Sequence, residues 1–292
     1  MPGGWVERRV DAPDGVSLFA RDWQPAAGTP ERLPVLCLHG LTRNSRDFDE
    51  LAPWLAALGR RVIALDVRGR GLSGRSADPM RYQLPVYAGD VLNLLDALGI
   101  RRAHFIGTSM GGLITLLVSA RRIDAVASAI LNDVGPEIDP AGIARIAGYA
   151  GKQAVIESWD DAVAYVKRTS EIAFPDFGEA DWRALAEKAF VEDAGGRPVL
   201  DYDPAISVPM ARRPPPSRSF IAWLLFWRLS RKRSVLLVRG AMSDIVSGAV
   251  AAKMRRAAPK MVYAEVPRVG HAPLLTEPDA KEAIAGFLAG QP

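Results

Sequence analysis

The chain has 292 residues, 49% of them hydrophobic and 24% charged, a composition typical of a globular protein rather than a disordered or fibrous one. Its 37 basic and 33 acidic residues leave a net charge of +4, too small to indicate nucleic-acid binding by itself. The single cysteine, Cys37, excludes an internal disulfide, and this length can bury a sizeable core.

Strand-like and helix-like segments alternate along the first part of the chain, in the order that builds a mainly parallel sheet with helices on both faces. Residues 6–10 and 16–23 flank Pro13, Asp14 and Gly15, and this arrangement predicts an antiparallel hairpin. Further strands are predicted at 35–39, 61–66 and 103–106, and helices at 47–58 and 86–98.

The most informative segment is residues 107–111, Gly-Thr-Ser-Met-Gly. It follows the predicted strand 103–106 and precedes an apolar stretch, 112–120, that is long enough for a buried helix. A sharp strand-to-helix turn would hold Ser109 in a strained conformation with its hydroxyl exposed, and Cβ atoms two residues either side would clash across the turn. This setting predicts that Ser109 is a catalytic nucleophile.

A serine nucleophile needs a general base, and the chain has only three histidines. His271 lies in a loop framed by glycine and proline, after the strand-like segment 261–266 and before a terminal helix opened by Glu277 and Pro278. His104 lies inside a predicted strand and fits a structural role, while His39 follows a strand and fits a loop-shaping role. We therefore predict that His271 is the base.

The carboxylate that orients the base has two candidates, each in a segment that follows a predicted strand. Asp244 follows the strand-like segment 234–238, and Asp133 follows 128–132. Asp244 is the preferred candidate, and Asp133 is the rival. If Asp133 has only a structural role, it is a turn residue whose side chain hydrogen-bonds its own backbone near Gly135.

With these residues in order, the chain resembles the α/β-hydrolase superfamily, of the kind that includes bacterial carboxylesterases and lactonases. Its members use the order Ser, Asp, His. The segments that carry the resemblance span most of the chain and are residues 38–42, 66–73, 107–112, 239–244 and 270–273. The resemblance implies an α/β fold with a mostly parallel eight-stranded sheet flanked by helices.

The alternation of strand-like and helix-like segments stops after Asn132 and resumes at Ser234. We therefore expect a hydrolase core formed by residues 1–135 and 231–292, with residues 136–230 inserted after the sixth strand as a helical cap, or lid. A cap in that place would cover the carboxyl edge of the sheet, where open α/β sheets bind ligands.

Two backbone amides are predicted to form the oxyanion hole. One belongs to Met110, the residue after the nucleophile, and the other to Leu41, which follows Gly40. Substrate contacts are expected from side chains just past the oxyanion turn and from tryptophans of the cap, namely Arg43, Asn44, Phe48, Trp159 and Trp223.

These residues predict a serine hydrolase that cleaves a small carboxylic ester or a lactone through an acyl-enzyme, with no cofactor and no metal. Ser109 argues against dehalogenase and epoxide hydrolase chemistry, which uses an aspartate nucleophile in this superfamily. C–C bond hydrolysis and perhydrolysis use the same triad and stay open. A hydrolase-fold binding protein without turnover is the alternative from another class of function.

Location and partners follow from what the chain contains. The N-terminus lacks the hydrophobic region of a signal peptide, and the apolar run 220–227 is far shorter than a membrane span, so we expect a cytoplasmic protein that does not insert stably in membranes. The basic clusters around Pro214 and after residue 227 indicate a solvated face, and no nucleic-acid partner is expected. The oligomeric state is not predicted.

Overall fold

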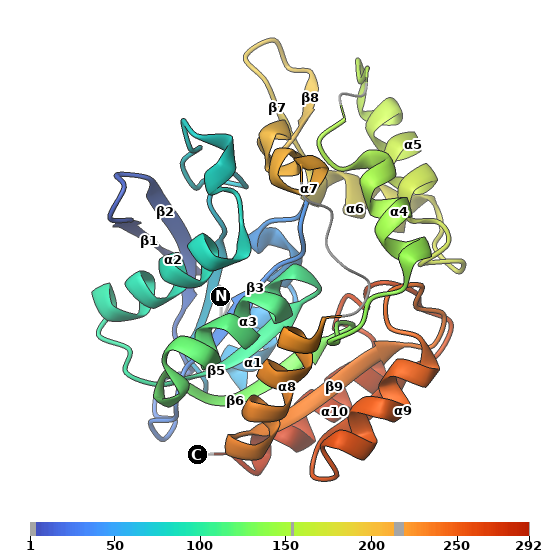
Figure 1. The fold of residues 1–292 in the computed structure, drawn as a ribbon. Coiled ribbons are helices and arrows are strands. Elements are labelled where there is room, and N and C mark those ends of the chain that lie inside the picture. Colours follow the sequence, from blue (N-terminus) through green and yellow to red (C-terminus); the bar gives the residue numbers. More distant parts are fainter. Residues whose placement is uncertain (1–3, 153–154, 213–218, 292) are drawn as a thin grey trace.

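The computed structural model describes residues 4–152, 155–212 and 219–291. Its centre is one eight-stranded sheet (Figure 1). The strands are β1 (Trp5–Asp11), β2 (Ser17–Trp23), β3 (Val35–Leu38), β4 (Val62–Asp66), β5 (Ala103–Thr108), β6 (Val126–Asn132), β9 (Ser234–Gly240) and β10 (Val262–Val266). They lie in the order β1-β2-β4-β3-β5-β6-β9-β10, with β1 antiparallel to β2, β2 antiparallel to β4 and the other neighbours parallel. The predicted sheet and opening hairpin are confirmed.

Helices cover both faces of this sheet, because alternate residues of each strand point to opposite sides. Leu36 and Leu38 of β3 share a buried cluster with α2, α3, α8 and α9, while Val35 and Cys37 pack with α1 and α10 on the other face. These helices are α1 (Leu51–Ala57), α2 (Leu84–Ala97), α3 (Met110–Arg121), α8 (Phe220–Lys232), α9 (Gly248–Ala257) and α10 (Pro278–Ala289). Short 3₁₀ turns lie at Ser45–Phe48, Pro79–Arg81, Ile123–Ala125 and Pro204–Ser207.

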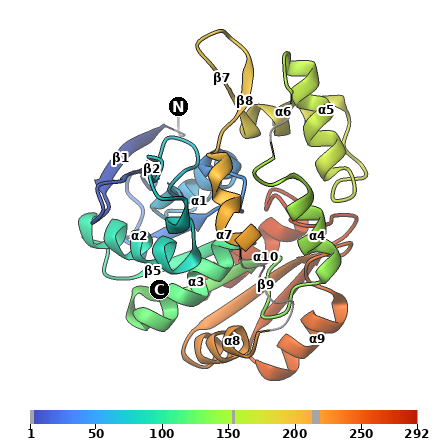
Figure 2. The same ribbon diagram turned by 45° about the horizontal axis from the view of Figure 1, so that its top comes forward.

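The segment inserted after β6 forms a cap above the carboxyl ends of the parallel strands (Figures 1 and 2). It comprises α4 (Pro140–Tyr149), α5 (Trp159–Ser170), α6 (Glu179–Ala189), β7 (Phe190–Glu192), β8 (Pro198–Leu200) and α7 (Val208–Arg212). Tyr165, Phe174, Trp182 and Phe190 belong to a small buried cluster of its own. The expected cap is therefore present, although it carries a β-hairpin besides its helices.

The predicted end of the cap at residue 230 is wrong. Phe226 and Leu229 of α8 are buried in the same cluster as α3, so this helix covers the sheet and belongs to the core. The opposite side of α8 exposes Phe220 and Trp227, and apolar residues on both sides hide the helical period in the sequence. Arg213, the prolines 214–216 and Arg218, which belong to the predicted basic cluster, lie outside the described residues.

Within the described ranges, no helix is long and apolar enough to cross a membrane.

Candidate active site

Ser109 lies in a strained turn between β5 and α3, with φ 51° and ψ −112°. Glycine is required on both sides of it. A Cβ on Gly111 would lie 2.1 Å from the carbonyl oxygen of Leu38, and one on Gly107 would lie 2.5 Å from the backbone of Gly111. The turn therefore needs the two glycines for the steric reason expected from the sequence, and it presents the Ser109 hydroxyl at the carboxyl edge of the sheet.

The structure brings three side chains together at this edge. Nε2 of His271 lies 2.9 Å from Oγ of Ser109, and Nδ1 of His271 lies 2.7 Å from Oδ2 of Asp133. A carboxylate can only accept, so Nδ1–H donates to Asp133 and Nε2 is left to accept the serine proton. This is the geometry of a nucleophile, a general base and an orienting acid.

Asp133 is held rigidly for this role. Its side chain is fully buried, and besides His271 it accepts hydrogen bonds from the backbone amide of Gly240 at 3.1 Å and from Oγ of Ser243 at 2.6 Å. Its φ of 51° turns the chain sharply at the end of β6. The three donors satisfy the buried carboxylate and fix its direction.

The prediction that Asp244 orients His271 is therefore wrong. Both oxygens of Asp244 accept hydrogen bonds from Arg145 of the cap, at 2.5 and 2.8 Å. Burial acts to raise the pKa of Asp244, but the hydrogen bonds and the charge of Arg145, together with weaker contributions that include His271, keep that pKa below its ordinary value. The preceding residue, Ser243, points toward the triad instead, so the loop after β9 offers a hydroxyl where a carboxylate was expected.

Ser243 and Asn132 contribute to the site and were not predicted. Nδ2 of Asn132 donates to Thr108 Oγ1 at 3.0 Å and to the carbonyl of Pro273 at 2.8 Å, which joins the ends of β5 and β6 to the histidine loop. The sequence signal for this residue was its position at the end of a strand, directly before Asp133.

The predicted oxyanion amides lie beside the nucleophile. Met110 is the first residue of α3, where amides have no acceptor within the helix. Leu41 lines the space next to Ser109, and a Cβ on Gly40 would lie 4.0 Å from the Cβ of Ser109. Their role as oxyanion donors stays a proposal.

His39 supports this turn. The amide of Val67 donates to Nε2 of His39 at 3.0 Å, so Nδ1–H donates to the carbonyl of Gly40 at 2.7 Å. Complete burial lowers the pKa of His39 to about 4, which keeps the ring neutral. His104 is also buried, with Nδ1 2.7 Å from Oγ of Ser128. The structure thus gives both histidines the loop-shaping and structural contacts that were expected.

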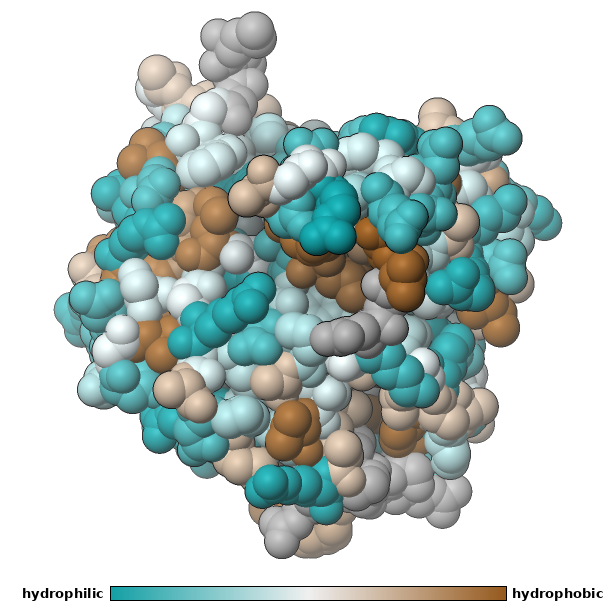
Figure 3. Space-filling model, turned by 90° about the horizontal axis from the view of Figure 1, so that it is seen from above, coloured by the Kyte–Doolittle hydropathy of each residue, from teal (hydrophilic) through white to brown (hydrophobic). Residues whose placement is uncertain are grey.

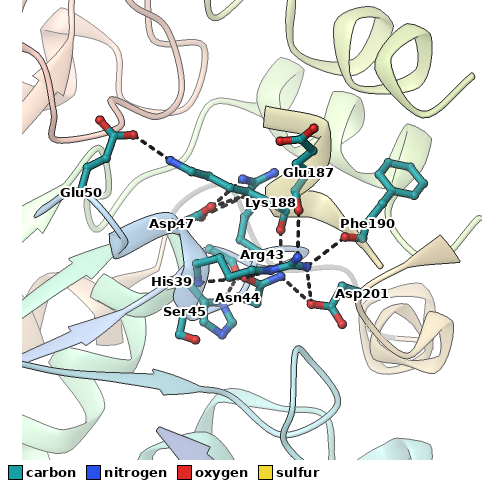
Figure 4. Close-up of polar contacts among 12 residues, drawn as sticks. His39, Arg43, Asn44, Ser45, Asp47, Glu50, Glu187, Lys188, Phe190 and Asp201 are labelled. Atoms are coloured by element: carbon teal, nitrogen blue, oxygen red, sulfur yellow. Dashed lines mark hydrogen bonds and ion pairs between the residues drawn. The ribbon is translucent and has the colours of Figure 1, made fainter. Parts of the chain in front are cut away.

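The segment after the oxyanion turn is fastened to the cap (Figure 4). Nδ2 of Asn44 donates to the carbonyl of Lys188 and to Asp201, and Arg46 donates to Asp201 at 2.6 Å and to the carbonyls of Glu187 and Phe190. Asn44 therefore joins cap and core and, contrary to the prediction, does not line the cavities at Ser109.

Two cavities meet at Ser109. The first has a volume of about 140 Å³ and includes His271, Arg43 and Phe48 among its lining residues. The second has a volume of about 400 Å³ and an apolar lining from core and cap, without a charged side chain among the described residues around it. Seen from the cap side, apolar side chains gather near the middle of the face, bordered by polar ones (Figure 3).

Arg43 and Phe48 thus lie where substrate contacts were expected, but the two cap tryptophans do not. The indole N–H of Trp159 donates to Glu192, and that of Trp223 donates to Glu137, and neither ring lines either cavity. An aromatic residue type and a position in the cap do not tell which way a ring points. Among the described residues, no group of three or more His, Cys, Asp or Glu side chains could hold a metal ion.

Comparison with known proteins agrees with this architecture. The sequence pattern of the alpha/beta hydrolase fold family matches residues 34–278. The chain is 36% identical over 265 residues to the 3-hydroxybutyrate-oligomer hydrolase of Cupriavidus necator, covering 88% of this chain and 89% of the relative. It is 29% identical over 260 residues to the 2-(acetamidomethylene)succinate hydrolase of Mesorhizobium japonicum, covering 87% of each.

Among solved structures, an alpha/beta hydrolase from Novosphingobium aromaticivorans superposes with a TM-score of 0.91 and 39% identity, over 98% of this chain and 99% of that one. A sequence match over most of the chain and a shared fold together establish the relationship: this chain belongs to the alpha/beta hydrolase fold family.

Proposed function

We propose that the protein is a serine hydrolase that cleaves a small carboxylic ester through an acyl-enzyme, with Ser109 as nucleophile, His271 as general base and Asp133 as the orienting acid. The observation that carries this proposal is the unbroken chain of hydrogen bonds from Asp133 through His271 to Ser109, at 2.7 and 2.9 Å.

The reaction follows from these contacts. Oγ of Ser109 attacks the ester carbonyl carbon while its proton moves to Nε2 of His271, and the carbonyl oxygen takes up negative charge near the amides of Leu41 and Met110. The C–O bond to the alcohol then breaks, and His271 returns the proton to the departing oxygen. Water, deprotonated by the same ring, attacks the acyl-enzyme and releases the acid and free Ser109.

The first relative supports ester chemistry without fixing the substrate, whereas the substrate named for the second carries an amide and no ester. The Cupriavidus relative is described as a hydrolase of 3-hydroxybutyrate oligomers, and the Mesorhizobium relative as one of 2-(acetamidomethylene)succinate. Lactone, C–C bond and perhydrolytic reactions would use the same triad, and a panel of such substrates compared by kcat/KM ranks them against open-chain esters.

The test is covalent labelling of the nucleophile. A fluorophosphonate should add one adduct per chain, located at Ser109 by peptide mass spectrometry, and should abolish the hydrolysis of p-nitrophenyl butyrate in parallel. Ser109→Ala should remain folded, take up no label and retain at most the slow turnover that the oxyanion hole provides. Labelling at another residue, or p-nitrophenyl butyrate turnover by Ser109→Ala close to wild type, would refute the proposal. A protein that takes up no label and has no turnover would instead favour the binding protein.

A further inference from the structure

The two cavities at Ser109 differ in chemistry, and the triad assigns a part of the ester to each. His271 must reach the departing alcohol oxygen, because it returns the proton there. His271 lines the smaller cavity, called the polar cavity below because Arg43, Asp47 and Arg145 also line it. It is not among the described residues around the apolar cavity. The alcohol part of the ester therefore belongs in the polar cavity.

The acyl part then occupies the other side of Ser109. That cavity of about 400 Å³ is lined by Met110 and Leu113 of α3, by Ile138 and Ile143 from the start of the cap, and by Met210 of α7. Burial of an apolar chain among these side chains is favourable, whereas a charge there would be desolvated without a partner.

The polar cavity continues outward into a third cavity of about 630 Å³. Arg145 and Tyr149 of α4 line both, and Lys152, Arg168 and Glu171 line the outer one. Asp244, the partner of Arg145, lines neither cavity. The one lining carboxylate among the described residues of the polar cavity, Asp47, is paired with Arg43. An anion there would thus meet the guanidinium of Arg145 and not the Asp244 carboxylate behind it.

Arg145 has donors to spare for such an anion. A guanidinium carries five N–H groups; Asp244 accepts from one on Nε and one on Nη2, and a hydrogen bond with Tyr149 uses a third, so two are left. The bonds to Asp244 raise the pKa of Arg145 and fix its plane, while burial raises the pKa of Tyr149 and keeps its hydroxyl a neutral donor. Arg43 also lines the polar cavity, but it does not line the outer one.

We propose that the substrate is an open-chain ester of an apolar acid with a hydroxy acid, and that Arg145, together with Tyr149, binds the carboxylate of the hydroxy-acid part. The inference rests on the proposed function and adds the direction of binding and the residue that selects the substrate. Separate cavities for the two parts favour an open-chain ester over a lactone, whose two parts are joined in one ring.

The test compares esters that differ only in the charge and its place. O-Butyryl lactate and O-butyryl β-hydroxybutyrate carry the carboxylate on the alcohol part, and each is paired with its neutral carboxamide. Monoethyl succinate carries the carboxylate on the acyl part and is paired with ethyl butyrate. For at least one of the two hydroxy-acid esters, kcat/KM should exceed that of the matching carboxamide ester by about 10- to 100-fold, the size expected for a hydrogen bond to a charged group. Monoethyl succinate should not exceed ethyl butyrate.

Arg145→Met should reduce the ratio of carboxylate to carboxamide about tenfold or more. If Arg145→Met folds poorly, the double variant Arg145→Met with Asp244→Asn replaces it, because that variant leaves no unpaired carboxylate in the half-buried site. It should show the same reduced ratio. Arg183→Met, which changes an arginine of α6 that lines none of the three cavities, is the matched control and should leave the ratio unaltered.

The proposal fails if the wild-type ratio is near one, if the acyl carboxylate is preferred, or if both Arg145 variants keep the wild-type ratio. Any of these results, with Ser109-dependent cleavage of p-nitrophenyl butyrate intact, leaves the proposed function standing. If the wild-type protein does not cleave p-nitrophenyl butyrate, the proposed function itself is refuted.

Discussion

At the scale of single residues, Ser243 is the unexpected partner of the triad. Its Oγ donates to Asp133 at 2.6 Å and accepts from the amides of Ile245 and Val246. Ser243→Ala removes one of three donors to a buried carboxylate, so we expect kcat for p-nitrophenyl butyrate to fall about tenfold. Ser230→Ala on α8, whose hydroxyl bonds only its own helix backbone at Trp227, is the control. Equal kcat values for the two variants would show that Ser243 does not support Asp133.

The choice of acid shows the limit of prediction at this scale. Asp133 and Asp244 each follow a strand whose carboxyl end lies near Ser109, and the sequence placed both there. Which carboxylate faces His271 depends on the direction of one side chain in each turn. In the loop after β9, the side chain of Asp244 bonds Arg145, while that of its neighbour Ser243 points toward the triad. No local sequence pattern predicts which of two adjacent side chains faces the histidine.

At the scale of elements, the contact between the elbow and β3 is the tightest constraint. A Cβ on Gly111 would meet the backbone of Leu38 at 2.1 Å, so Gly111→Ala must displace α3 or β3. We expect this variant to lose more than about 3 kcal/mol of unfolding free energy or to fail to fold. Gly286→Ala in α10, where a Cβ meets nothing within 4 Å, should be neutral or stabilising by up to about 1 kcal/mol. Similar denaturation midpoints for both variants would contradict this packing.

The turn after β3 should make stability depend on pH through His39. Its pKa of about 4 in the folded protein lies below its ordinary value of 6.5, so the unfolded chain binds the proton more readily. Stability is therefore retained above pH 6.5 and lost as pH falls toward 4, by roughly 2 kcal/mol between pH 6.5 and pH 5. Urea denaturation at several pH values should show this loss in the wild type and a smaller one in His39→Gln. Parallel curves would exclude His39 as its source.

Strands buried on both faces of the sheet were predictable, and so was the presence of a cap, but the elements inside the cap and its C-terminal end were not. The apolar runs of β3, β4 and β5 mark their strands because both faces are covered. The predicted helix at 47–58 is divided into the turn Ser45–Phe48 and α1, since the oxyanion segment also bonds the cap. In the cap, the helices are amphipathic, but the three-residue strands β7 and β8 are too short to give a comparable signal.

At the scale of the whole molecule, Arg46 links cap and core with three hydrogen-bond acceptors in the cap. It reaches Asp201 and the carbonyls of Glu187 and Phe190, all in the cap. Arg46→Ala should weaken this attachment by about 1–3 kcal/mol and speed chymotrypsin cleavage within the cap under native conditions. Arg183→Ala, which breaks an ion pair inside α6 with Glu187, should not. Equal cleavage rates would mean that the cap is held by other contacts.

The central claim is that the acid at the end of β6 completes the triad with Ser109 and His271. It is tested most directly by comparing kcat of Asp133→Asn and Asp244→Asn on p-nitrophenyl butyrate, a neutral ester. An amide at 133 favours the wrong tautomer of His271, so Asp133→Asn should lower kcat by about 10⁴-fold. Asp244→Asn breaks only the pair with Arg145 and should stay within about tenfold of wild type, as for a charge acting at longer range. The reverse ranking would assign the acid to the loop after β9 and contradict the account.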